Sequence, residues 1–216
     1  MMNVVALFFF VACGMVAQAF QLTEEDFRIF TDFKPGIRFI DIMPLLKDGY
    51  KFRETIKVMA EGIKKRNPKG VDYIAALELR GVLFGAPLAY ELGCGLVIIR
   101  KPGKLPGPII STHSSNSYGS TDLNVQQDAV EEGARVVIVD DGVSFGGTLA
   151  AACRLFKMLK ANILECDVVI DIPFLNGRKK IKKEAPHVEL YGVVEFNRLS
   201  MIRLRIQNAG MKYWFL

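Results

Sequence analysis

One continuous stretch of the chain reads Val136-Val137-Ile138-Val139-Asp140-Asp141-Gly142-Val143-Ser144-Phe145-Gly146-Gly147-Thr148-Leu149. Its first four residues are apolar and typical of a buried strand. Two adjacent carboxylates follow, and a turn containing Gly146 and Gly147 then leads into a segment with helical spacing. An apolar strand that passes through a glycine turn into a helix is a building unit of parallel α/β sheets.

Each part of this stretch suits a sugar phosphate. Glycines let backbone N–H groups approach a phosphate closely, and a helix N-terminus adds unsatisfied donors and partial positive charge. Asp140 and Asp141 can accept hydrogen bonds from a vicinal diol such as ribose hydroxyls. The alternative is a tight strand-to-helix turn with helix-capping acids. The stretch is neither a Walker loop nor a dinucleotide fingerprint, because Gly-Lys-Thr and GxGxxG are both absent from it.

Short apolar runs and helical patterns alternate through the rest of the chain. The runs predict buried strands at Tyr73–Leu77 and Gly95–Ile99, and further strands at Arg135–Val139, Glu165–Ile172 and Glu189–Val194. The helical patterns lie at Phe52–Lys65, Gly81–Leu92 and Leu149–Lys160, with a shorter one after Thr23. This alternation predicts an α/β fold with a mainly parallel, twisted sheet and helices on both faces. Residues 102–122 are rich in Gly, Pro, Ser, Thr and Asn, which predicts a long loop, either a functional lid or disordered.

Composition limits the choice of function. The chain has 216 residues, of which 50% are apolar and 24% charged, as in a single globular domain. The net charge of +5 suits anionic ligands but fits nucleic acid almost as well. Only His113 and His187 are histidines, and Cys94, Cys153 and Cys166 form no CxxC pair. A histidine triad, a zinc site and a disulfide framework are therefore not indicated.

The first 19 residues differ from the rest. They carry no charged side chain, contain the apolar run Val4–Ala12 and end in Ala17-Gln18-Ala19. This pattern predicts a signal peptide cleaved after Ala19 and entry into the secretory pathway. The run is too short for a comfortable membrane span, so no stable span is expected after its removal. The alternatives are an uncleaved anchor and a misplaced gene start.

Four motifs together resemble one enzyme family. The stretch from Val136 to Leu149 resembles the ribose-phosphate signature of type I phosphoribosyltransferases, and Asp72–Gly85 resembles their pyrophosphate loop. Ile99–Pro108 is very close to a stretch typical of adenine phosphoribosyltransferases, whose adenine-side hood Phe33–Gly36 and Phe39–Ile42 resemble. The resemblance covers roughly residues 23–196. It implies a phosphoribosyltransferase domain at 20–196, divided into a hood (20–45) and a core (46–196), between the 1–19 leader and a 197–216 tail.

The resemblance implies a reaction and its partners. Adenine and phosphoribosyl pyrophosphate would give AMP and pyrophosphate, as in purine salvage. Mg²⁺ would ride on the pyrophosphate, with no direct protein ligand, and the protein would be a homodimer. Such enzymes are cytoplasmic, which conflicts with the predicted leader.

The resemblance also implies residue roles. Catalytic residues would be Asp140, Asp141, Arg80 and Tyr118. Substrate-binding residues would be Arg38, Phe39, Ile40, Arg80, Gly81, Arg100, Lys101, Lys104, Tyr118, Ser144, Phe145, Gly146, Gly147 and Thr148. The two aspartates would hold the ribose hydroxyls, the glycine turn the 5′-phosphate, and Phe39 the adenine ring. Phe39 could instead pack in a core. Arg100, Lys101 and Lys104 could instead form a solvated basic edge.

Several positions depart from the family pattern. Ser117 and Ser120 replace the Glu and Lys that flank the lid Tyr-Gly, and Phe145, Glu78 and Ile40 replace Thr, Asp and Arg. Loss of an acid or base can cost about 100- to 10,000-fold in rate, whereas backbone donors survive these changes. The alternative function is therefore a secreted, catalytically impaired paralogue that binds a purine nucleotide or sugar phosphate. Nucleic-acid binding ranks third, because no basic–aromatic motif supports it.

Overall fold

Five parallel strands form the centre of the computed structural model, which describes residues 20–34, 37–116 and 119–197. The strands lie in the order β4-β3-β7-β8-β9. Their bounds are β3 Tyr73–Leu77, β4 Gly95–Ile99, β7 Arg135–Val143, β8 Asn162–Asp171 and β9 Glu189–Glu195. The predicted parallel α/β sheet is confirmed. The predicted leader, the lid residues Ser117 and Tyr118, and residues 198–216 of the tail lie outside the described ranges.

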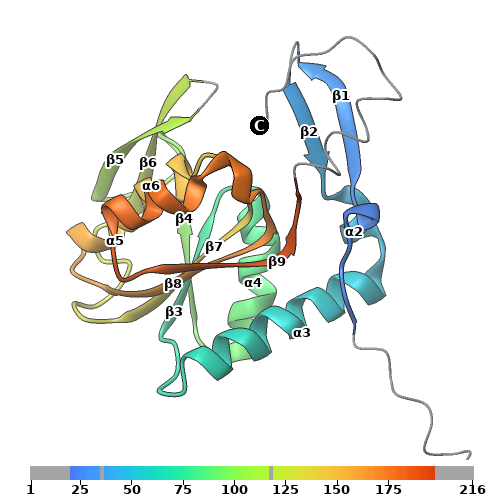
Figure 1. The fold of residues 1–216 in the computed structure, drawn as a ribbon. Coiled ribbons are helices and arrows are strands. Elements are labelled where there is room, and N and C mark those ends of the chain that lie inside the picture. Colours follow the sequence, from blue (N-terminus) through green and yellow to red (C-terminus); the bar gives the residue numbers. More distant parts are fainter. Residues whose placement is uncertain (1–19, 35–36, 117–118, 198–216) are drawn as a thin grey trace, which may run out of the picture.

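Alternate residues of each central strand face opposite layers of helices (Figure 1). On one face, Ile74 and Val137 pack against α3 (Gly49–Arg66) and α4 (Arg80–Leu92). On the other face, Ala75 and Ile138 pack against α5 (Gly147–Met158) and α6 (Gly177–Glu184). The two cores fix the strands in one register, since a slip by one residue would exchange the faces.

The helix ends follow capping rules. Asp48 accepts hydrogen bonds from the backbone N–H groups of Tyr50 and Lys51 and so starts α3. Gly93 adopts the left-handed conformation at φ 67° and ends α4, as its position in the sequence predicts. At the end of α3, Arg66 forms ion pairs with Glu165 and Asp167 of β8, both at 2.8 Å. These buried contacts hold the long helix on the sheet.

Two antiparallel hairpins lie outside the central sheet. β1 (Arg28–Lys34) pairs with β2 (Ile37–Asp41), and β5 (Ile109–Asn116) pairs with β6 (Gly119–Gln126). Figure 1 shows them rising at the upper right and upper left of the sheet. The prediction of a long loop at 102–122 is therefore wrong for the strand residues, because eight residue pairs of β5 and β6 lie in register. Its role as a functional lid stays a prediction.

Two further expectations need correction. β7 continues past Val139 through both aspartates to Val143, because β8 pairs with it as far as Val143–Asp171. β4 is an edge strand rather than a fully buried one, and Leu96 and Ile98 are 39% and 37% exposed. The remaining short elements are η1 Glu24–Asp26, α2 Met43–Lys47 and η2 Pro173–Leu175. No helix within the described ranges is long and apolar enough to cross a bilayer.

Candidate active site

The glycine turn lies between β7 and α5, as the sequence predicts. Gly146 caps α5 in the left-handed conformation at φ 73°, which glycine adopts without strain. Its carbonyl oxygen accepts the first helical hydrogen bond from Ala150. The first turn of α5 contains no acidic residue, so its N–H groups and positive end face no fixed anion of their own helix. Ser144, Phe145 and Thr148 are all half-buried along this turn.

The backbone at the start of α6 packs directly against the glycine turn. The start of α6 packs against it so closely that a Cβ on Gly177 would lie 2.5 Å from the Ser144 carbonyl oxygen. The same Cβ would lie 3.0 Å from the Gly146 nitrogen. Gly177 was missed by the sequence reasoning. The neighbouring Asn176, which adopts φ 59°, makes an Asn-Gly pair that could have marked a tight turn here.

The two aspartates lie side by side at the end of β7. Asp141 is buried, with 6% exposure, and its backbone N–H donates a hydrogen bond of 2.9 Å to Oδ1 of Asp140. Burial, together with the charge of Asp141, raises the pKa of Asp140 well above its usual range. Burial also raises the pKa of Asp141, although the Arg80 guanidinium opposes this shift. Negative charge on this buried pair is therefore energetically costly. Hydroxyl groups of a ligand would lower that cost by donating hydrogen bonds to the carboxylates.

Arg80 connects the acid pair to the N-terminal hairpin. Its Nε lies 3.1 Å from Oδ2 of Asp141, and its Cζ lies 5.2 Å from the centre of the Phe39 ring. The next residue is a glycine for a steric reason. A Cβ on Gly81 would lie 2.8 Å from the Val139 carbonyl oxygen and 2.9 Å from Oδ1 of Asp140. The structure thus brings Asp140, Asp141, Arg80, Gly81 and Phe39 together.

The segments after β3 and β4 lie beside each other at the same edge. Nε of Arg100 donates a 2.7 Å hydrogen bond to Glu78, and this ion pair lowers the pKa of the Glu78 carboxyl. Glu78 therefore fixes the side chain of Arg100. Glu78 itself lies two residues before Arg80 in the sequence. Lys101 and Lys104 are exposed on the segment after Arg100, as a solvated basic edge would be, and remain accessible to an anion.

The hood strand β2 presents its residues in alternation. The Phe39 ring is half-buried next to Arg80, whereas the Ile40 side chain is only 8% exposed and belongs to the core. A ligand could therefore meet only the backbone of Ile40. The side chain of Arg38 is outside the described part of the chain, as is the whole of Tyr118, so both predictions stay predictions.

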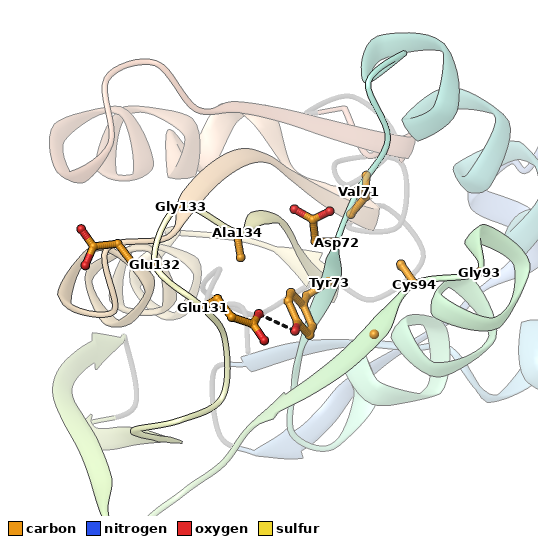
Figure 2. Close-up of a pocket in the computed structure, with 10 residues that line it drawn as sticks. Val71, Asp72, Tyr73, Gly93, Cys94, Glu131, Glu132, Gly133 and Ala134 are labelled. Atoms are coloured by element: carbon orange, nitrogen blue, oxygen red, sulfur yellow. Dashed lines mark hydrogen bonds between the residues drawn. The ribbon is translucent and has the colours of Figure 1, made fainter.

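An open pocket of about 700 Å³ lies at the opposite edge of the sheet, where β3, β4 and β7 begin. Figure 2 shows its three carboxylates and the hydrogen bond from Tyr73 to Glu131. Asp72 pairs with Arg135 at 2.7 Å, and Glu132 pairs with Lys160 at 2.8 Å. Since each acid already has a partner within the protein, the pocket offers no unsatisfied charge to a ligand.

Comparison with known proteins relates the chain to one family. The family model for the phosphoribosyl transferase domain matches residues 46–197. Adenine phosphoribosyltransferase from Rattus norvegicus is 48% identical over 162 residues, which cover 74% of this chain and 90% of that protein.

Solved structures give the same result. Adenine phosphoribosyltransferase from Thermoanaerobacter pseudethanolicus superposes with a TM-score of 0.74 at 41% identity, covering 80% of this chain and 97% of that one. The Saccharomyces cerevisiae enzyme, solved with an imino-altritol bisphosphate and adenine, gives 0.73 at 35% identity, covering 79% and 95%.

Proposed function

The chain belongs to the adenine phosphoribosyltransferase family, and we propose that it forms AMP and pyrophosphate from adenine and phosphoribosyl pyrophosphate. The single observation that carries this function is the meeting of three groups at one sheet edge. Arg80 contacts both Asp141 and Phe39, and the aspartates stand at the strand end that leads into the glycine turn. This arrangement supports a phosphate site, a diol site and an aromatic face that would bind one nucleotide.

The phosphate and ribose sites follow from the backbone. The N–H groups from Ser144 to Thr148 would hold the 5′-phosphate at the positive end of α5. Asp140 and Asp141 would accept hydrogen bonds from the ribose 2′- and 3′-hydroxyls, replacing the contact of Asp141 with Arg80. Arg80 would then be free to bind pyrophosphate together with the N–H of Gly81, since guanidinium binds phosphate with a fork of donors.

The base site lies under the hood. The Phe39 ring would stack on adenine, while the backbone of residues 38 and 40 would read the edge of the base. The burial of the Ile40 side chain supports this division, because it leaves the main chain as the only part that can face the base. Tyr118 would close over the reacting carbon and exclude water.

The chemistry requires little covalent participation by the protein. The bond from C1′ to the pyrophosphate oxygen breaks, a bond from C1′ to an adenine ring nitrogen forms, and the proton of that nitrogen passes to the departing pyrophosphate or to solvent. Positive charge develops on the ribose as the first bond lengthens, so negative charge on the aspartate pair would stabilise it. The glycine turn and Arg80 hold the two ends of the donor, which keeps C1′ in line with the base.

Mg²⁺ would reach this site on the pyrophosphate of the substrate, with no direct protein ligand. Mg²⁺ usually keeps several waters and binds substrate phosphates. Among the described residues, no group of three or more His, Cys, Asp or Glu side chains could hold a metal ion. When bound, the ion would neutralise charge on the departing pyrophosphate. The requirement for Mg²⁺ is part of this proposal.

The altered positions would lower rate more than affinity. Phe145 replaces a hydroxyl donor in the turn but retains its backbone N–H, and Ser117 and Ser120 remove charge from the lid. The relatives' identity of 46–48% favours an enzyme over the non-catalytic binding protein. We expect Ser117→Glu to raise kcat, because it restores a group that proton transfer can use.

A direct assay tests the function. Protein beginning at Phe20 is incubated with adenine, phosphoribosyl pyrophosphate and Mg²⁺, and AMP is measured by chromatography. We expect AMP to form, and hypoxanthine to serve poorly as a replacement for adenine. Absence of AMP at high enzyme concentration, in protein that still binds AMP by calorimetry, would leave only the non-catalytic alternative.

Two features of the whole protein complete the proposal. We propose that the leader is removed after Ala19, which sequencing of the N-terminus of secreted protein would test. We also propose a homodimer, supported by the apolar side chains of Leu96 and Ile98 on the exposed edge strand and of Leu79, 70% exposed, near Arg80. Sedimentation equilibrium would give twice the chain mass if this is correct.

A further inference from the structure

The guanidinium of Arg154 joins three separate elements. Its Nε donates a 3.2 Å hydrogen bond to the hydroxyl of Thr112 on β5, and its Nη2 donates to the carbonyl oxygen of His113. Its Nη1 donates a 2.7 Å hydrogen bond to Glu184 at the end of α6. Arg154 itself lies on α5, two turns after the glycine turn. One side chain therefore links the phosphate-binding helix, its supporting helix and the β5–β6 hairpin.

Among the described residues, the hairpin has few other directional contacts with the rest of the protein. It forms its own two-stranded sheet, and an isolated bridge between Asn124 of β6 and Arg100 joins it to the residue that follows β4. Apolar residues such as Leu123 and Val125 also pack in the core beside α5. Apolar packing is not directional, so it leaves the angle of the hairpin to polar contacts. Arg100 provides the contact to β6, and Arg154 provides the contact to β5.

Arginine suits this task for physical reasons. Its planar fork can satisfy acceptors on three sides at once, and it stays charged at every physiological pH. The side chain is 33% exposed and that of Glu184 is 29% exposed, so the contacts are partly shielded from water. Hydrogen bonds from a charged donor are roughly twice as strong as neutral ones.

We propose that Arg154 is a positioning residue that fixes the β5–β6 hairpin against the phosphate-binding helix. It touches neither reacting atoms nor the predicted substrate contacts. Its consequence for catalysis rests on the proposed function, in which Tyr118, which lies between β5 and β6 in the sequence, would close over the reacting centre. The positioning itself does not depend on that function and can be measured in the absence of substrates.

The test is hydrogen exchange of the hairpin amides in the full mature protein. Arg154→Gln should speed exchange across β5 and β6 by about tenfold or more, because it removes the charged donor. Thr112→Val removes one of the three contacts and should give a smaller increase in the same amides. Lys157→Gln is the matched control, since Lys157 lies on the same helix and donates to the Glu184 carbonyl oxygen without touching the hairpin. It should leave hairpin exchange unchanged.

Kinetics supply the second readout. If the hairpin positions a closing residue, Arg154→Gln should lower kcat several-fold and leave the KM for phosphoribosyl pyrophosphate within about twofold. Arg154→Lys should rescue only in part, because an ammonium lacks the fork.

Unchanged hairpin exchange in Arg154→Gln would overturn the inference, and so would faster exchange shared equally by the β3 and β7 amides. Inactivity of the unsubstituted protein would refute the proposed function while leaving the exchange result to decide the role of Arg154.

Discussion

The parallel strands of the central sheet begin at one edge and end at the opposite edge. The pKa values of carboxyl groups shift in opposite directions at these two edges. At the edge where β3 begins, the hydrogen bonds from Arg135 lower the pKa of Asp72 to about 2. At the edge where β7 ends, burial raises the pKa of Asp140 well above its usual range. The first carboxylate stabilises the fold, whereas the second is held where its charge is costly. The open pocket lies at the edge where β3 begins and the candidate site at the edge where β7 ends, so buried and costly charge locates the chemistry better than volume does.

The largest expected effect comes from removing charge at the edge where β7 ends. Asp141→Asn should lower kcat/KM for phosphoribosyl pyrophosphate by about 100- to 1,000-fold, because it deletes a preorganised charge that contacts the substrate. Steady-state assays with saturating adenine measure this. The paired acid at the other edge supplies the control, since Asp72→Asn should leave kcat/KM unchanged. Equal losses in the two variants would remove the contrast between the edges.

A geometric change should give the next largest effect. Gly177→Ala places a methyl group 2.5 Å from the Ser144 carbonyl oxygen, so the phosphate-binding turn must move. A small misplacement of this kind can cost up to about 100-fold in rate. We expect the KM for phosphoribosyl pyrophosphate to rise more than the KM for adenine. Gly49→Ala is the control, because nothing lies within 4 Å of a Cβ at Gly49. An unchanged KM in Gly177→Ala would show that the turn does not rest on α6.

Stability should respond to pH with opposite signs at the two edges. A carboxyl whose pKa is raised in the folded state binds protons more readily when folded. Its ionisation therefore lowers the free energy of unfolding as pH rises through that pKa. Each unit of elevation costs about 1.4 kcal/mol. Asp140→Asn should therefore raise the melting temperature at pH 8 and lose this advantage near pH 4. Asp128→Asn, at an exposed position, is the control. A variant that is less stable at pH 8 would contradict the proposed cost of charge.

The smallest effect is expected from the ion pair at the edge where β3 begins. Asp72→Asn should reduce the free energy of unfolding by about 1 kcal/mol or less, because Asp72 and Arg135 are 39% and 32% exposed and water screens their attraction. The lowered pKa means that the contribution is complete above about pH 4 and is lost as pH falls through about 2. Urea unfolding at pH 7 and pH 2.5 measures both values. A larger loss at pH 2.5 than at pH 7 would reverse the expected sign.

Local patterns were sufficient to predict the central sheet. The runs Tyr73–Leu77 and Gly95–Ile99 form strands with the predicted bounds, and Gly93 ends the helix between them. The acid pair, Arg80 and the glycine turn could be placed at one edge because parallel strands end together. What alternation could not show was which strand lies at the edge of the sheet, so Leu96 and Ile98 were wrongly expected to be buried.

Features that depend on distant partners were not predictable. β5 contains Ser111-Thr112-His113-Ser114-Ser115, a polar run without strand periodicity, and becomes a strand only through pairing with β6 and packing on α5. α6 was missed for a related reason, since its lysine-rich sequence has only Ile181 to bury. Gly177 and Arg154 act across elements far apart in the chain, and no local motif marks such contacts.

An NMR titration with AMP tests the central claim most directly. If the nucleotide binds at the edge where β7 ends, amide shifts will change at residues 80–81 and 144–149. The residues of the opposite pocket, at 93–95 and 131–134, will stay unperturbed. Saturable shifts confined to that pocket, with none in the glycine turn, would contradict the account.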